Sequence, residues 1–82
     1  MPRYFFDIAS EHAIRDEDGE DLPDSEAARD AAIHIASELL PVHRRQLAQT
    51  GRVAITVRDQ AGAVLHELEC RLTSHAPAVR PD

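Results

Sequence analysis

Residues 14–19 read Ile-Arg-Asp-Glu-Asp-Gly, and the same phrase returns at residues 57–62 as Val-Arg-Asp-Gln-Ala-Gly. A leucine follows each copy three residues later, at Leu22 and Leu65. Both copies have the chemistry of a tight β turn, because the Asp side chain caps backbone donors and the Gly accepts a left-handed conformation. The two turns bracket the only long helical pattern in the chain. This arrangement predicts a hairpin, a helix and a second hairpin.

Alternating apolar residues predict the strands on either side of that helix. Residues 3–9 are rich in aromatic and β-branched side chains and predict a first strand, with Phe5 on its less apolar face. A short second strand is expected over residues 13–16. Residues 53–57 and 64–72 predict the third and fourth strands, joined by the second turn.

The helix between the hairpins is expected to begin at Asp24 or Ser25, where a side-chain oxygen can cap the first turn. Pro41 lacks a backbone donor, so the helix must kink or restart there, and Gly51 is expected to cap its end. A stripe with three- and four-residue steps is expected to pack on the sheet, and it consists of Ala28, Ala31, Ala32, Ile35, Leu39 and Val42.

The sequence therefore predicts one α+β domain over residues 1–72, with the order ββαββ. Its four-stranded antiparallel sheet is expected to carry one helix, kinked at Pro41, on one face. Residues 73–82 contain two prolines and few anchoring groups, and they are expected to form a disordered tail.

Length and charge exclude several classes of function. A chain of 82 residues is one small domain with a thin core, and its net charge of −6 repels phosphate backbones, so nucleic acid is not an expected partner. No apolar run approaches the roughly 20 residues that cross a bilayer, so no membrane partner is expected. Cys70 is the single cysteine, which excludes an internal disulfide and, with the lack of an apolar signal core, favours the cytoplasm.

The acidic run in the first turn suggests a divalent cation site, with Asp16, Asp18 and Glu20 as ligands, because hard cations prefer carboxylate oxygens. The spacing does not match an EF-hand loop. If Gly19 is placed at the turn position of that loop, the last ligand becomes Ser25. The second copy of the phrase also lacks the extra carboxylates, which favours a solvated turn. A cation-binding module remains the alternative.

No catalytic signature is present, and neither an enzyme activity nor a cofactor is expected. Nucleophile elbows, phosphate-binding glycine loops and helical His-Glu metal motifs are all missing from the sequence. His66 and Cys70 share a strand face, but four residues of extended chain separate them by roughly 13 Å, too far for one metal ion. We interpret Cys70 as a core thiol.

One further pattern concerns association between proteins. A second helical stripe, rotated from the first, consists of Ile33, Ala36, Leu40, His43 and Leu47. Either a partner helix packs there, or the stripe is the shoulder of a wide core-facing surface. The open sheet face bearing Phe5 is a competing interface. We expect a protein-interaction module that binds itself as a homodimer, or binds another small protein, through Phe5, Ile33, Leu40 and Leu47.

Four short segments carry a resemblance to a known family: Met-Pro-Arg-Tyr-Phe-Phe at residues 1–6, Asp-Glu-Asp-Gly at 16–19, Leu-Pro-Asp at 22–24 and Glu-Ala-Ala-Arg at 26–29. Over roughly residues 1–70 the chain resembles a family of short bacterial proteins of unknown function. The resemblance implies a cytoplasmic stand-alone domain with no established activity. The chain departs from the family pattern at Asp7, where histidine is expected, and at Pro41.

A looser likeness exists at the level of the fold alone. A strand pair, an Asp-Gly turn and an Ala/Glu-rich helix resemble the partial ribonuclease-H-like domain of HicB-type antitoxins. This likeness implies a regulatory partner as a further alternative, although the chain has no recognisable DNA-binding segment.

Overall fold

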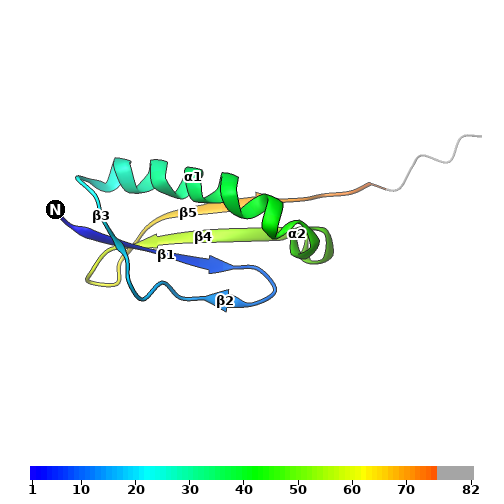
Figure 1. The fold of residues 1–82 in the computed structure, drawn as a ribbon. Helices are drawn as coiled ribbons and strands as arrows, with labels where there is room; N and C mark the ends of the chain where they lie inside the picture. The colour runs from blue at the N-terminus through cyan, green and yellow to red at the C-terminus, as the bar shows by residue number, and fades with distance from the viewer. Residues whose placement is uncertain (76–82) are drawn as a thin grey trace, which may run out of the picture.

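The computed structural model describes residues 1–75 as an antiparallel sheet with a long helix on one face and a short helix at one end (Figure 1). The elements in chain order are β1 (Arg3–Ala9), β2 (Ala13–Ile14), β3 (Glu20–Asp21), α1 (Ser25–Val42), α2 (Arg44–Thr50), β4 (Arg52–Arg58) and β5 (Val64–Arg71). The α+β class and the antiparallel sheet are confirmed. The expectation of four strands and one kinked helix is wrong, because five strands and two helices form within residues 1–75.

The sheet order is β2-β1-β4-β5, with β3 paired to β1. The strand pair β4 and β5 forms the second predicted hairpin. At its turn Asp59 Oδ1 accepts a hydrogen bond from the Ala63 N–H (2.9 Å), and Gly62 has a φ of +89°. The Asp-x-x-Gly chemistry predicted for residues 59–62 is therefore present.

The first copy of the phrase forms the same kind of turn but not a hairpin. Asp16 Oδ1 accepts hydrogen bonds from the Asp18 and Gly19 N–H groups, both at 3.1 Å. The strands on its two sides do not pair with each other, because β2 pairs with the end of β1 and β3 pairs with its beginning. The second strand, expected at 13–16, ends at Ile14. Together β2 and β3 form one broken edge alongside β1.

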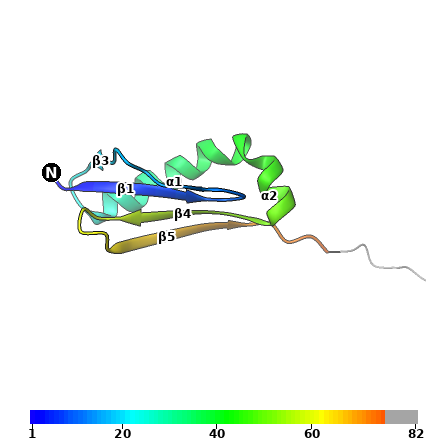
Figure 2. The same ribbon diagram turned by 90° about the horizontal axis from the view of Figure 1, so that it is seen from below.

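The helix α1 begins as predicted. Asp24 is its N-cap, and Asp24 Oδ1 accepts a 2.8 Å hydrogen bond from the Ala27 N–H. Three alanines are buried against the sheet, namely Ala28, Ala32 and Ala36. Ala36 was expected on the second stripe, whereas Val42 of the first stripe is 74% exposed. The core-facing line therefore drifts around the helix, which crosses the sheet obliquely (Figure 2).

Pro41 restarts the helix rather than kinking it. Helix α1 continues to Val42, and α2 begins at Arg44, with His43 between them. A proline inside a helix removes one backbone donor and crowds the preceding turn, so the chain leaves helical geometry nearby. Gly51 caps α2 with a φ of +79°, as predicted.

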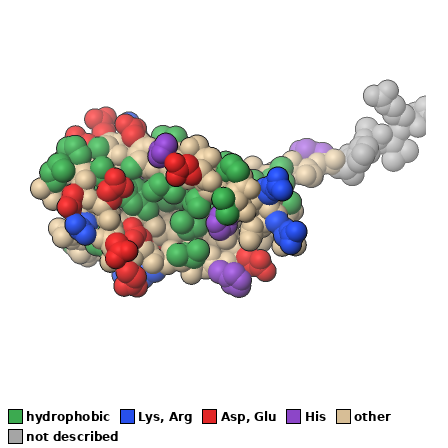
Figure 3. All heavy atoms as spheres, viewed as in Figure 1, with side chains coloured by type: hydrophobic (Ala, Val, Ile, Leu, Met, Phe, Trp, Pro, Cys, Tyr) green, Lys and Arg blue, Asp and Glu red, His purple; other side chains and the backbone are tan. Residues whose placement is uncertain are grey.

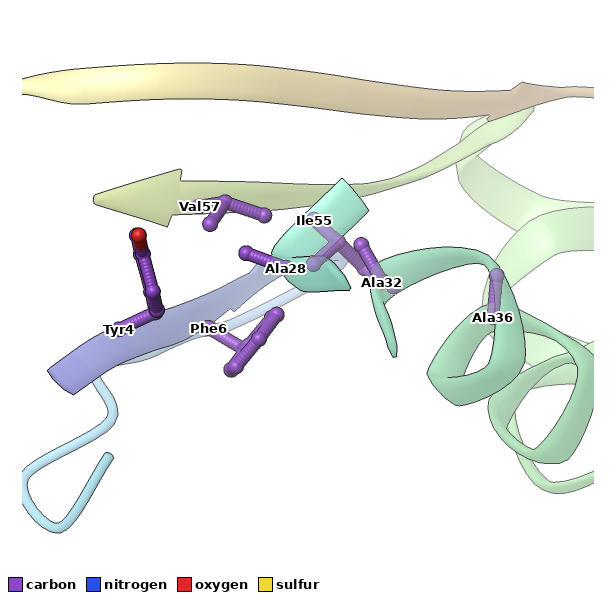
Figure 4. Packing of buried hydrophobic residues seen from close by; sticks show 7 residues of the cluster. All are labelled: Tyr4, Phe6, Ala28, Ala32, Ala36, Ile55 and Val57. Atoms are coloured by element: carbon purple, nitrogen blue, oxygen red, sulfur yellow. The ribbon is translucent and has the colours of Figure 1, made fainter. Parts of the chain in front are cut away.

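The core lies in one thin layer between α1 and the sheet. Its buried side chains include Tyr4 and Phe6 from β1, Ile55 and Val57 from β4, and the small alanines of α1 (Figure 4). One helix cannot cover the whole sheet. In the space-filling view, hydrophobic side chains gather in the middle of one face, within a rim of charged groups (Figure 3).

The structure describes only the first three residues of the tail predicted at residues 73–82. Thr73–His75 follow β5 without regular structure, and the rest of the predicted tail, residues 76–82, lies outside the described residues. Among residues 1–75, neither helix has the length and hydropathy that a membrane crossing requires.

The two turn glycines give a matched test of the broken edge. Substituting either glycine with alanine forces an L side chain into left-handed backbone, at about 1–2 kcal/mol. At Gly19 a Cβ would also lie 2.9 Å from Arg3 Cγ, Phe5 Cε1 and the Tyr4 carbonyl oxygen, whereas at Gly62 it would meet nothing within 4 Å. We expect Gly19→Ala to lower the free energy of unfolding by a further ~1–3 kcal/mol.

Urea unfolding followed by circular dichroism measures both losses, with Gly62→Ala as the control. Equal losses would show that the first turn does not pack against β1.

Candidate functional site

The carboxylate of Asp16 replaces part of the backbone ladder at the broken edge. Its Oδ2 accepts a 3.0 Å hydrogen bond from the Phe6 N–H, and its Oδ1 accepts the two turn bonds described above. The Asp16 N–H in turn donates to Asp7 Oδ1 at 2.8 Å. Side-chain hydrogen bonds thus hold the segment between β2 and β3 against β1, where backbone pairing has ended at Ile14.

Arg58 joins the second phrase to the first. Its Nε donates to Asp7 Oδ2 at 2.7 Å, and its Nη2 donates to the Asp16 carbonyl oxygen at 2.8 Å. The guanidinium also lies over the Phe5 ring, 4.6 Å from the centroid. The Arg58 side chain is only 12% exposed. Arg58 and Asp7, which are 51 positions apart, therefore belong to one half-buried cluster on the open sheet face. The periodicity of the sequence does not reveal this contact.

The contacts of this cluster lower the pKa values of Asp7 and Asp16. Burial alone would raise the pKa of Asp7, but the hydrogen bonds from Arg58 and Asp16 and the charge of Arg58 outweigh it, and the pKa is lowered. Burial opposes ionisation of Asp16 too, yet the N–H donors of Phe6, Gly19 and Asp18 lower its pKa.

The three predicted cation ligands do not converge on a site. Both oxygens of Asp16 accept backbone hydrogen bonds, and Asp18 uses its carbonyl oxygen to accept a 2.8 Å bond from Arg3 Nη1. Glu20 lies in β3 with its side chain exposed. Across residues 1–75, no group of three or more His, Cys, Asp or Glu side chains is arranged to hold a metal ion.

A Ser-His contact links the start of α1 to β5. His66 Nε2 lies 2.8 Å from Ser25 Oγ and 2.9 Å from the Ser25 carbonyl oxygen. This nitrogen faces both oxygens and so anchors the start of the helix. A catalytic triad also needs an acidic side chain that orients the histidine ring, and within the described part of the chain none is hydrogen-bonded to His66. The two residues are 41 positions apart, so their contact was not predictable from spacing.

The outer edge of β5 is the most extended unpaired feature of the sheet. Within residues 1–75 no strand pairs with it, and it runs for eight residues. The Leu72 N–H donates inward to the Gly51 carbonyl oxygen at 2.8 Å. Because backbone direction alternates along an antiparallel strand, the N–H and C=O groups of Glu67, Glu69 and Arg71 point outward.

Apolar surface gathers on the same strand. The exposed large hydrophobic side chains of the described residues are Met1, Ile14, Ile33, Val42, Val64, Leu65 and Leu72. Three of the seven lie in β5 or directly after it. The side chains of Leu68 and Cys70 pack against the core but are only partly buried.

The four predicted interface residues are dispersed. Phe5 lies beneath the Arg58 guanidinium on the open sheet face. On the helices, Ile33 is 54% exposed, whereas Leu40 and Leu47 are half-buried. The structure therefore does not gather them into one apolar surface. The sequence did not predict the edge of β5, although its charged residues, Glu67, Glu69 and Arg71 at every second position, were visible there.

The surface of residues 1–75 also has shallow hollows. One, of about 230 Å³, lies between β1 and β2, and another, of about 350 Å³, lies between the N-terminus and the β4–β5 turn. Both are open, and neither combines a nucleophile with a base.

An open antiparallel sheet with α1 on one face and α2 at one end defines a small α+β domain. The chain belongs to the family described as a domain of unknown function (DUF6894), which it matches over residues 3–71. No curated protein and no solved structure shows a significant match to the chain. The expected resemblance to a family of short domains of unknown function is confirmed. The likeness to HicB-type antitoxins finds no support.

The acidic cluster makes stability depend on pH. Because the pKa values of Asp7 and Asp16 are lowered on folding, the unfolded chain binds protons first as the pH falls. Their contribution is complete well above the ordinary value of 3.8 and is lost as the pH falls through the lowered values. We expect Asp7→Asn to reduce stability at pH 7 and to flatten its decline in acid.

Urea unfolding at a series of pH values between neutrality and strong acid measures this dependence. Gly62→Ala is the control, since it lowers stability away from the carboxylates and should keep the parental pH dependence. A parental acid decline in Asp7→Asn would contradict the assignment.

Proposed function

We propose that this chain is a non-catalytic protein-interaction module that acts as a homodimer, with the outer edge of β5 as its interface. The observation that carries the proposal is the eight-residue free edge, whose outward backbone groups have no partner strand within the described residues. Unpaired strand edges are sites of strand addition, where backbone hydrogen bonds supply affinity.

The thin core supports association. The largest fully buried side chains are only Ile55 and Val57, and the buried part of α1 consists of alanines. A domain of this size is marginally stable because it buries a small share of its surface, so added apolar burial by a second copy is favourable.

The other candidate surfaces are less suited to a partner. On the open sheet face, Arg58 covers Phe5, and the remaining groups include the exposed ion pair of Arg3 with Asp21. On the helices, Ile33 alone is exposed among the three predicted residues. We place the module in the cytoplasm, because its one cysteine, Cys70, is free and suits a reducing compartment.

Light scattering after size exclusion tests the proposal. We expect the parent chain, of 9.1 kDa, to elute at twice that mass at high micromolar concentration. Glu69→Pro removes an outward N–H that the monomer does not use, so it should give a folded monomer. Arg71→Pro, at the next outward position, should do the same, and circular dichroism checks the fold of each variant.

Two control variants assign the surface. Ile33→Glu changes the helical stripe, and Ile14→Glu changes the opposite edge of the sheet, so both should remain dimeric. A parent that is monomeric at high micromolar concentration would refute the dimer. A dimer that survives Glu69→Pro but dissociates in Ile33→Glu or Ile14→Glu would place the interface elsewhere. Binding of a different small protein with the parent still monomeric would replace self-association.

A further inference from the structure

We infer that β5 pairs with β5 of a second copy in one antiparallel register, centred on Cys70, in which Glu69 faces Arg71 of the other copy. This inference rests on the proposed dimer and specifies the contacts at the same edge. Three features of β5 support this register: the direction of its backbone groups, the order of its charges and the residual exposure of its apolar face.

The backbone restricts the pairing first. Residues of β5 that face outward are Glu67, Glu69 and Arg71, whereas the residues between them bond to β4. A hydrogen-bonded pair across the seam needs outward groups on both strands, so these residues must face one another. A two-fold axis then passes between the two strands, midway between the two copies of one residue, and the long helices of both copies lie on the same face of the joined sheet.

Charge then selects among the remaining registers. A centre at Glu67 places Glu67 opposite its own copy, and a centre at Leu68 places Glu67 opposite Glu69 twice. A centre at Glu69 pairs Glu67 with Arg71 twice but also places Glu69 opposite its own copy, and a centre at Arg71 pairs two arginines. Among these registers, only the centre at Cys70 pairs unlike charges, Glu69 with Arg71 and Arg71 with Glu69, without also pairing like charges. Directly opposed unlike charges stabilise a strand pair, and like charges destabilise it.

The charges within one strand already suit this arrangement. Arg71 Nε donates to Glu69 Oε1 at 2.8 Å, and this contact lowers the pKa of Glu69. In the joined sheet, each of the four charges also faces an opposite charge across the seam. Mixed signs on an edge do not repel a second copy, unlike the uniform charge that blocks edge pairing.

The opposite face of the strand is complementary too. In the same register Leu68 faces Leu72 of the other copy, and Cys70 faces Cys70. Leu72 is 44% exposed and Leu68 is partly buried in the monomer, so the pairing covers apolar surface. These are non-hydrogen-bonded pairs, whose Cα atoms lie about 4.5 Å apart, within the range that a disulfide spans.

Charge reversal tests the register through the dimer dissociation constant, measured by analytical ultracentrifugation. Glu69→Arg alone and Arg71→Glu alone each place like charges across both pairs, and each should raise the dissociation constant about tenfold or more. The double variant restores opposite charges and should return to within about threefold of the parent. Glu67→Arg is the matched control, because Glu67 faces the uncharged Thr73, and it should change the constant less than about twofold.

Oxidative cross-linking gives an independent readout. Copper phenanthroline takes two electrons from two facing thiols, which lose their protons and form the disulfide. The parent should become a covalent dimer through Cys70, and reductant should reverse it. In Cys70→Ser/Leu72→Cys the new thiol faces Leu68 rather than its own copy, so this variant should not cross-link.

The outcomes separate the two proposals. A monomeric parent refutes both the dimer and the register. A dimer that Glu69→Pro dissociates, but that neither cross-links through Cys70 nor regains affinity in the double variant, keeps the β5 interface and refutes this register. Cross-linking in Cys70→Ser/Leu72→Cys, or a large effect of Glu67→Arg, would identify a shifted pairing.

Discussion

The ion pair between Arg58 and Asp7 is the constraint on which the rest of the structure depends. One guanidinium bonds to β1 through Asp7, to the first turn through the Asp16 carbonyl oxygen, and stacks over Phe5. Hydrogen bonds to charged groups contribute about 1.5–3 kcal/mol each, a large share of the stability of a small domain. Because the pair is half-buried, either charge alone would be left poorly solvated. The contacts of Arg58 thus hold the first turn and β1 against β4.

Much of the fold was predictable because it depends on local chemistry. Period-two alternation located β1 and β4, and the capping chemistry of Asp24 and Gly51 located the helical ends. The turn chemistry of both phrases was also correct. The pairing around the first turn was not predictable, because it depends on a carboxylate of Asp16 that takes the place of strand backbone.

The remaining differences come from contacts between distant segments. The pairs Arg58–Asp7 and His66–Ser25 join residues 51 and 41 positions apart, and no periodic pattern encodes them. The burial of Ala36 and the exposure of Val42 follow from the oblique crossing of α1, which sequence periodicity does not specify. For the candidate site, the charges of β5 were visible in the sequence, but their position on a free edge required the sheet order.

The interruption between β2 and β3 limits how far a joined sheet can grow. Each of these strands is two residues long, and five residues of turn separate them, so this side offers no continuous ladder to an incoming strand. A sheet that is extendable on both sides can add copies without end and form filaments. A sheet that is extendable on one side stops when two such sides meet. The broken edge of this domain therefore blocks the addition of a further copy on that side, so strand addition ends in a finite assembly.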